Sequence, residues 1–411
     1  MGYKKDAIKG LSWASGARMV TRLFTFIKIA LLARVLAPSQ FGLFGIASLV
    51  LALLEVLTET GINILIVQSK QKISEYVNSA WVVSIIRGCV ISLSIIILSP
   101  FIAAFFNTPE SFHLLLFISI VPLVRGFINP SIALYQKELR FHAEFWFRSV
   151  VLLIDTSVAI GISLLTHSVY SLVWGMLAGA VVEVVLSFIL ITPRPRFSIE
   201  REYFKDIFHK GKWVTIYTVF NYFAENGDNV IVGRLMGAAS LGLYQMAYKL
   251  SILPISEISE VVSRVVFPIY VKISHDKKRL LGAFLKTLGY MSLSATLLGC
   301  VIFFFPDQLI TLFLGDKWLA AAPVLKVLAL YGIVRTFSGP TSALFLSVGM
   351  QRYVTAMTFT RFAGLVLTIY PFVRWYGMVG AGYSALFSAV VELPVMFFFA
   401  AKVLNWYNRK Q

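Results

Sequence analysis

Charged residues are scarce in this chain: only 14% of its 411 residues are Asp, Glu, Lys or Arg, whereas 58% are hydrophobic. A soluble domain of this length would carry about a quarter charged residues and about half apolar ones. The mean hydropathy of +0.79 leaves too little polar surface to cover the apolar side chains in water. This composition excludes a soluble enzyme and indicates a polytopic membrane protein.

Residue types that hold metals or carry out catalysis are also few. Cys89 and Cys300 lie far apart in two apolar runs, which excludes a disulfide framework and a metal cluster. The five histidines are scattered without the spacing of metal ligands, and the sequence has no G-x-x-x-x-G-K-[ST] phosphate loop. We therefore expect no enzymatic activity, no ATP hydrolysis and no cofactor.

Long apolar runs, by contrast, are abundant. A membrane-spanning helix needs about 20 apolar residues, and continuous runs favour helices over the alternating strands of a barrel. We expect an all-α protein with about twelve transmembrane helices. They cover roughly residues 11–36, 41–66, 79–106, 112–135, 145–166, 169–192, 212–235, 240–270, 280–305, 321–348, 353–373 and 378–402.

Acidic residues are the scarcer of the two charge types, with 20 against 37 basic ones and a net charge of +17. If the N-terminus is cytoplasmic, most basic residues outside the spans lie on the cytoplasmic side, and few lie outside. This positive-inside asymmetry predicts that both termini are cytoplasmic in a multi-pass protein of the inner (cytoplasmic) membrane. Because many basic residues lie inside apolar runs, we expect membrane lipids as partners and no nucleic acid.

An internal repeat divides the chain. Residues 33–47 align without gaps with residues 233–247, and residues 124–135 align with residues 334–345 through the pattern V-R-x-F-x-x-P-[ST]-x-A-L-[FY]. Two matches in the same order and at similar offsets predict two pseudo-symmetric six-helix lobes of the same orientation. Parallel repeats of this kind are typical of transporters, which bind substrate where the repeats meet. The predicted lobes are residues 1–200 and 201–411.

Basic side chains inside the predicted spans are the candidate binding residues. A charge at the centre of the bilayer costs at least about 2.5–3.5 kcal/mol, so each should face a partner or a hydrated cavity. Arg18 and Arg22 share one helix face near Lys28, while Arg125 and Arg335 occupy equivalent places in the repeat. Guanidinium groups suit a phosphate or pyrophosphate. We therefore predict that these five residues bind an anionic head group.

Other charged residues in the spans have more than one interpretation. Arg148, Arg264 and Arg361 are favoured as interfacial or locally paired side chains rather than as cavity residues. Glu225 and Asp228 lie on one polar stripe of the seventh span. An intramembrane carboxylate can bind Na⁺, carry a proton or neutralise an arginine. Coupling to Na⁺ or H⁺ through Glu225 or Asp228 therefore remains open beside structural pairing, which is favoured.

Helix-breaking residues lie beside the repeated arginines. Pro122, Gly126 and Pro130 interrupt the fourth span, and Gly339 and Pro340 interrupt the tenth. Proline removes a backbone hydrogen bond of the helix and clashes with the preceding turn, so we expect kinks in both spans.

Four segments resemble Wzx-type polysaccharide biosynthesis and export flippases, members of the multidrug/oligosaccharidyl-lipid/polysaccharide exporter superfamily. These segments are residues 33–47, 58–68, 228–248 and 314–325. The resemblance implies a MATE-like fold of two six-helix lobes and transport by alternating access. It also implies a cargo, an oligosaccharide linked to undecaprenyl pyrophosphate, which moves from the inner to the outer leaflet for O-antigen, capsule or exopolysaccharide synthesis.

The resemblance further implies a basic central cavity, and other polysaccharide assembly proteins as partners beside the lipid-linked oligosaccharide. By this resemblance the residues of the cavity are Arg18, Arg22, Lys28, Arg125 and Arg335.

Three alternatives remain beside this function. A cation-coupled multidrug exporter of the same superfamily would line its cavity with acids and aromatic residues, against which the basic residues of the spans argue. A flippase for a peptidoglycan precursor would also carry a pyrophosphate-linked sugar. A membrane glycan polymerase or ligase would need catalytic residues on an outer loop, but the predicted outer loops hold almost no Asp, Glu, His or Arg.

Overall fold

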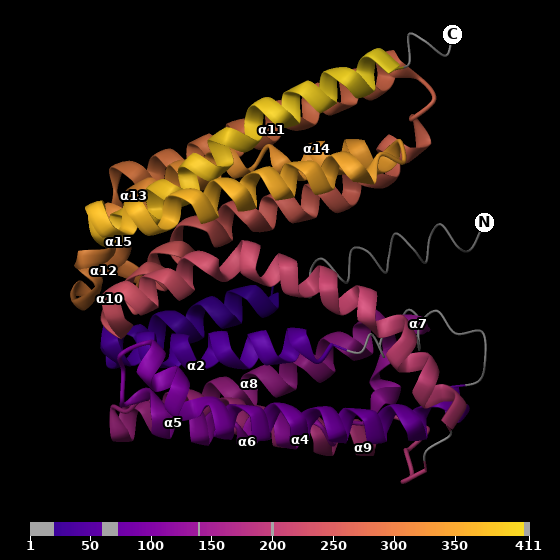
Figure 1. The fold of residues 1–411 in the computed structure, drawn as a ribbon, viewed down its shortest axis with the longest axis vertical. Coiled ribbons are helices and arrows are strands. Elements are labelled where there is room, and N and C mark those ends of the chain that lie inside the picture. Colours follow the sequence, from indigo (N-terminus) through magenta and orange to yellow (C-terminus); the bar gives the residue numbers. More distant parts are fainter. Residues whose placement is uncertain (1–19, 60–72, 139, 199–200, 407–411) are drawn as a thin grey trace. The chain divides into compact units, whose positions relative to one another are not determined.

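The computed structural model describes residues 20–59, 73–138, 140–198 and 201–406, and over these residues every regular element is a helix (Figure 1). The all-α class predicted from the apolar runs is therefore confirmed. After a first helix over residues 20–35, the elements are α2 (Pro38–Leu57), α4 (Ile73–Phe105), α5 (Ser111–Ile118), α6 (Ile120–Arg125), η1 (Pro130–Ala133), α7 (Leu134–Lys137), α8 (Phe141–Thr166), α9 (Tyr170–Leu190), α10 (Arg201–Lys272), α11 (Lys277–Phe304), α12 (Pro306–Phe313), η2 (Asp316–Ala321), α13 (Ala322–Arg335), α14 (Ser338–Ser347) and α15 (Gln351–Trp406).

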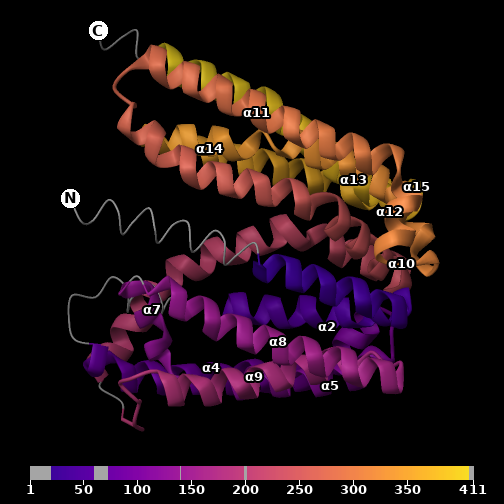
Figure 2. The ribbon, with the colours of Figure 1, turned by 180° about the vertical axis from the view of Figure 1, so that it is seen from behind.

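The chain forms two compact units, Met1–Phe223 and Ala224–Gln411. In the first unit α8 packs along α9 (Figure 2). Helix α6 packs against both α4 and α9. In the second unit α13 packs against α11 and α15, and α14 packs against α15. Along the chain, the boundary between the two units falls within α10. The lobes predicted from the repeat are instead divided between residues 200 and 201, and that division stays a prediction.

Within the described residues, eight helices are long and apolar enough to cross a membrane, or nine if the bent pair Ser111–Arg125 and Pro130–Lys137 forms one span. The longest of these, Gln351–Val403, has 53 residues. At 1.5 Å per residue it would extend about 80 Å as one straight helix, against a hydrocarbon core of about 30 Å. The helix is instead interrupted at Gly377 (φ 59°, ψ −141°), between the predicted spans 353–373 and 378–402. The first predicted span, 11–36, lies partly outside the described residues, and the count of twelve stays a prediction.

Large apolar side chains on the surface agree with a lipid environment. Leu165, Leu367 and Phe101 are 85%, 76% and 69% exposed, and they lie within candidate spans. Exposed apolar side chains at this density would be unfavourable in water, whereas lipid chains solvate them. Serine and threonine hydroxyls inside these helices commonly donate to the carbonyl three or four residues earlier, as Thr368 does to Gly364 at 2.7 Å.

The first aligned segment of the repeat carries a helix break at the same place in both copies. In the first copy the helix over residues 20–35 ends before Ala37, which is extended (φ −84°, ψ 157°), and Pro38 begins α2. In the second copy Gly237, aligned with Ala37, interrupts α10 at φ 80° and ψ 178°. Residues with a Cβ atom rarely adopt this backbone conformation, whereas glycine adopts it readily, which explains why glycine occupies position 237. The local structure therefore follows the sequence repeat.

The second aligned segment also breaks at matching places, because Arg125 is the last residue of α6 and Arg335 is the last residue of α13. The chain bends by 72° between Ser111–Arg125 and Pro130–Lys137. The predicted kink of the fourth span is confirmed. In the tenth span the helices separate at Thr336 and Phe337, and Gly339 and Pro340 lie in the first turn of the next helix, α14. Both breaks present the equivalent arginines at helix ends.

Gly237→Ala should destabilise the protein through its backbone alone, because a Cβ at position 237 would meet no atom within 4 Å. Holding alanine in this conformation costs about 1–3 kcal/mol. We expect a lower midpoint in thermal unfolding of the detergent-solubilised protein. Gly282→Ala is the matched control, since Gly282 lies inside α11 and its Cβ would also meet nothing within 4 Å. At position 282, alanine should leave the free energy of unfolding unchanged or raise it by up to about 1 kcal/mol. Equal midpoints for the two variants would contradict this account.

Candidate functional site

The first unit contains a cavity of about 700 Å³ lined by charged side chains. Glu55 comes from α2, Arg87 from α4, Arg125 from α6 and Glu183 from α9, so four helices of one unit converge on the cavity. Its volume falls within the range of about 300–1,000 Å³ typical of small-molecule sites. The remaining charged lining residues are Glu59 and Arg148.

Arg125 is held loosely in this cavity. Its Nη1 lies 3.8 Å from Glu55 Oε1, and its Nε lies 3.6 Å from Glu183 Oε2. Both distances exceed those of a hydrogen bond, and Nε is buried without a hydrogen-bond partner among the described residues. The side chain is 41% exposed. The carboxylates of Glu55 and Glu183 therefore compensate the positive charge of Arg125 without hydrogen-bonding to it, and its N–H donors remain available to a further acceptor.

The two other arginines of the cavity have closer partners. Arg87 Nη2 donates to the backbone oxygen of Glu55 at 2.7 Å, and its Nε donates to Thr58 Oγ1 at 3.2 Å. Arg148 pairs with Glu144 at 2.9 Å. Arg87 thus ties the end of α2 to α4. Arg148 has a local partner, as predicted, but the expectation that it would not be a cavity residue is wrong, because it lines this cavity.

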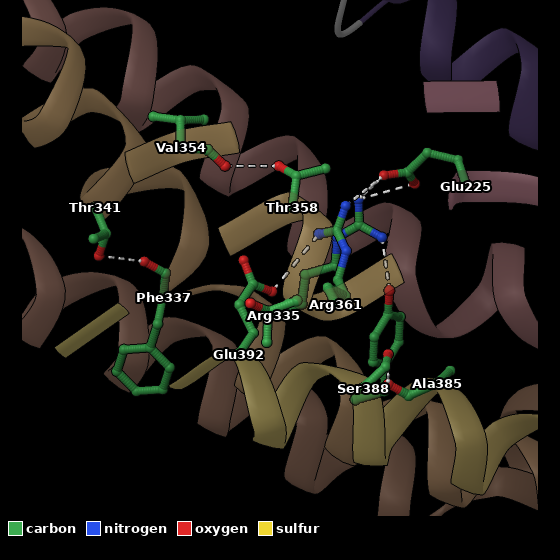
Figure 3. A network of polar contacts seen from close by, with 12 residues as sticks. Glu225, Arg335, Phe337, Thr341, Val354, Thr358, Arg361, Ala385, Ser388 and Glu392 are labelled. Carbon is green, nitrogen blue, oxygen red and sulfur yellow. Dashed lines mark hydrogen bonds and ion pairs between the residues drawn. The ribbon is translucent and has the colours of Figure 1, made fainter. Parts of the chain in front are cut away.

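The second unit holds a network of ion pairs around Glu225 (Figure 3). Arg335 Nη2 donates to both carboxylate oxygens of Glu225 at 2.7 and 2.9 Å, and its Nη1 donates to the Tyr331 hydroxyl at 2.7 Å. Arg361 Nη2 donates to the same Glu225 at 3.1 Å, and its Nη1 lies 3.9 Å from Glu392. Two guanidinium groups and two carboxylates balance one another here. Unlike Arg125, Arg335 is firmly bound by its own unit.

Asp228 lies one helical turn from Glu225 and is 4% exposed. Its carboxylate accepts hydrogen bonds from the Asn229 backbone and side chain at 2.7 and 2.9 Å and from the Tyr244 hydroxyl at 2.7 Å. All three donors are neutral. A cavity of about 10 Å³ lies between Asp228 and Glu225, which is about the space of one water molecule.

The predicted head-group residues do not all reach the cavities. Arg18 lies outside the described residues, and Arg22 is on an exposed face of the helix over residues 20–35. Lys28 Nζ donates to both carboxylate oxygens of Asp155 at 2.7 Å, which ties its helix to α8. Of the four predicted residues that the structure describes, Arg125 and Arg335 line the larger cavities, and they do so in different units.

Two glutamates that lie beside arginines of the two cavities were not singled out from the sequence. Glu183 lies near Arg125, and Glu392 lies near Arg361. A signal for them was present, because Glu183 follows Arg125 at nearly the same distance along the chain as Glu392 follows Arg335. The side chain of Arg264 is not among those described. Arg361 pairs with Glu225 and lies near Glu392, as predicted, but the expectation that it would not be a cavity residue is wrong, because it lines the cavity of the second unit.

The fold is that of multi-span helical transporters. A structure of the lipid II flippase MurJ in an inward closed conformation matches with a TM-score of 0.77 at 16% identity, covering 96% of this chain and 89% of that one. An inward-facing multidrug resistance MATE family transporter of the MOP superfamily matches with a TM-score of 0.72 at 18% identity, covering 95% and 96%. These likenesses define the class, a MATE-like multi-pass membrane protein. Residues 31–323 match the family described as polysaccharide biosynthesis protein, and the chain belongs to that family.

Curated relatives share most of the chain's length. An uncharacterized membrane protein in the cps region of Klebsiella pneumoniae is 26% identical over 98% of this chain and 84% of its own. The lipopolysaccharide biosynthesis protein WzxC of Escherichia coli (strain K12) is 24% identical over 84% and 71%. The teichuronic acid biosynthesis protein TuaB of Bacillus subtilis (strain 168) is 24% identical over 84% and 72%.

The two equivalent arginines should respond differently to removal of their charge. Arg335→Gln leaves Glu225 with one weaker ion pair; breaking a buried pair costs about 3–5 kcal/mol, and the 27% exposure of Arg335 favours the lower end. For Arg125→Gln we expect a change below about 1 kcal/mol, as for loose exposed pairs. Thermal unfolding and membrane abundance measure both effects.

Arg374→Gln serves as the control for charge removal, because Arg374 is exposed and makes no ion pair with a described residue. The double variant Arg335→Gln/Glu225→Gln restores charge balance with Arg361 and Glu392 and should recover part of the lost stability. Similar losses for Arg335→Gln and Arg125→Gln would refute the difference between the two sites.

Proposed function

We propose that this protein is a flippase that moves an undecaprenyl-pyrophosphate-linked oligosaccharide from the inner to the outer leaflet of the cytoplasmic membrane by alternating access. The product would serve the synthesis of a surface polysaccharide such as O-antigen, capsule or exopolysaccharide. The observation that carries the proposal is membership of the polysaccharide biosynthesis family together with a charged cavity inside a helical unit. The names of WzxC and TuaB support the same process.

The physical problem that such a protein solves is the transfer of a polar head group through hydrocarbon. Each sugar hydroxyl loses hydrogen bonds to water in an apolar medium, and a charged pyrophosphate cannot enter it unpaired. A hydrated cavity with guanidinium donors replaces these interactions, while the polyprenyl chain remains in lipid. No bond of the cargo has to be formed or broken, so the proposal includes no enzymatic step.

Within this function we assign the pyrophosphate to Arg125 rather than to Arg335. The long contacts of Arg125 to Glu55 and Glu183 and the 41% exposure of its side chain leave the guanidinium group able to bind phosphate oxygens. A bidentate guanidinium–phosphate contact is short and charge-assisted. For Arg335 a phosphate would have to displace Glu225 from contacts of 2.7 and 2.9 Å.

One observation supports the multidrug alternative. The cavity of the first unit is lined by three glutamates, Glu55, Glu59 and Glu183, which could attract a cationic substrate. Three arginines line the same cavity and balance these acids, and the family match covers residues 31–323. We therefore keep the lipid-linked anionic cargo as the proposal.

Deletion of the gene should remove one surface polysaccharide while its lipid-linked repeat unit accumulates at the cytoplasmic face. Wild-type protein should restore export, whereas Arg125→Gln should not, at equal membrane abundance. Arg125→Lys should restore it in part, because lysine keeps the charge but lacks the planar fork. Extraction and sugar analysis of the lipid-linked pool measure the outcome. Failure of the repeat unit to accumulate would overturn the function, and full export with Arg125→Gln would overturn the assignment of Arg125.

Between the two predicted coupling residues, we assign ion coupling to Asp228. Glu225 already neutralises Arg335 and Arg361, whereas Asp228 has neutral donors only, and a proton or Na⁺ could balance its charge. Asp228→Asn should therefore make export independent of the Na⁺ concentration and pH gradients that drive the wild-type protein. Asp307→Asn, at an exposed site at the start of α12, is the control. Unchanged dependence of export on both gradients in Asp228→Asn would show that Asp228 is structural.

A further inference from the structure

The second unit contains a cavity of its own, of about 590 Å³, whose lining differs from that of the first. Arg335, Arg361 and Glu392 supply its charged groups, and Phe267 supplies an aromatic ring that is 39% exposed. Its other polar side chains are hydroxyls from α10, α14, α15 and the turn after α13. They belong to Ser256, Ser259, Thr336, Ser338, Ser342 and Thr358.

The charges of this cavity are satisfied without a ligand. Arg335 is bound by both oxygens of Glu225, and Arg361 lies between Glu225 and Glu392 (Figure 3). An entering phosphate would have to compete with the short bidentate contact between Glu225 and Arg335. The site is therefore poorly suited to an anion, although arginines line it.

The hydroxyls are well placed to receive a neutral polar ligand. Thr336 donates to Gly332 O at 2.9 Å, and Thr358 donates to Val354 O at 3.0 Å, so each oxygen keeps lone pairs that can accept a hydrogen bond. Ser342 lines the cavity without a hydrogen bond to any described residue. Paired guanidinium and carboxylate groups add donors and acceptors side by side. Adjacent hydroxyls of a sugar ring, each both donor and acceptor, complement this pattern.

The two cavities thus offer different chemistry. The cavity of the first unit has three arginines and three glutamates but only two hydroxyl side chains, Ser84 and Thr218. The cavity of the second unit has six hydroxyl side chains, and its charged groups are already paired with one another and with Glu225. The charged part of a cargo would suit the cavity of the first unit, and a neutral hydroxylated part would suit the cavity of the second.

We propose that the cavity of the second unit is a saccharide-binding site, which takes sugar rings of the cargo through the hydroxyls of Ser259, Thr336, Ser342 and Thr358 and through the Arg361–Glu392 pair. The proposal rests on the flippase function and adds to it a place for the glycan apart from the phosphate. Phe267 offers an apolar surface to the C–H face of a ring. Arg335 positions Glu225 and Arg361 and does not itself bind the phosphate.

The test measures equilibrium binding to the purified full-length protein in detergent by calorimetry. The first probe is the oligosaccharide repeat unit, released by mild acid from the lipid-linked pool that accumulates in the deletion strain. The second probe is inorganic pyrophosphate. Ser342→Phe, which fills the cavity, should weaken oligosaccharide binding at least tenfold and leave pyrophosphate binding unchanged, whereas Arg125→Gln should do the reverse.

Ser347→Phe is the matched control, because Ser347 lies on the same helix, α14, outside the cavity. If Ser342→Phe unfolds at a lower temperature than the control, the double variant Ser259→Ala/Ser342→Ala removes two hydroxyls without adding bulk and should weaken oligosaccharide binding severalfold. Wild-type affinity for the oligosaccharide in the double variant and in a stable Ser342→Phe would overturn the saccharide site, as would loss of pyrophosphate binding in either. Absence of a lipid-linked pool in the deletion strain would instead reject the flippase function on which this site rests.

Discussion

Pairing of charges inside each helical unit is the constraint on which the polar interior of this protein depends. Removing a charged side chain from water costs several kcal/mol, which a close partner of opposite sign can offset. Lys28 with Asp155 and Arg335 with Glu225 meet this requirement at 2.7 Å. Such pairs connect helices that the apolar side chains alone would leave free to slide, because lipid solvates those side chains as well as the protein interior does.

Arg125 differs from these pairs, because it has no partner at hydrogen-bond distance among the described residues. Its two carboxylate neighbours lie 3.6 and 3.8 Å away, and one of its donors is buried and unsatisfied. The equivalent Arg335 has short contacts with Glu225 and Tyr331. The two copies of the repeat therefore share a helix break and an arginine but differ in how much of the arginine is already engaged. That difference supports separate roles for the two cavities in the proposed transport.

Several features could be predicted because they depend on neighbours in sequence. The all-helical class follows from apolar run length. The breaks at Ala37 and Gly237 fall in the gaps between predicted spans, and the break after Arg125 lies beside the helix breakers Gly126 and Pro130. The partner of Lys28 could not be predicted. Asp155 lies on α8, far along the chain, and several other acids stood at comparable depth in the predicted spans. Periodicity places a side chain on a helix face but does not say which helix that face will meet.

The sequence by itself determined the membrane-spanning helical class, the internal repeat, the positions of the breaks and the set of charged residues that must be compensated, because each depends on composition or on local order. Tertiary structure alone decided which charges are compensated and which are left with spare donors. Compensation requires contact within a few ångströms between residues on different helices, and that proximity arises only when the helices have packed.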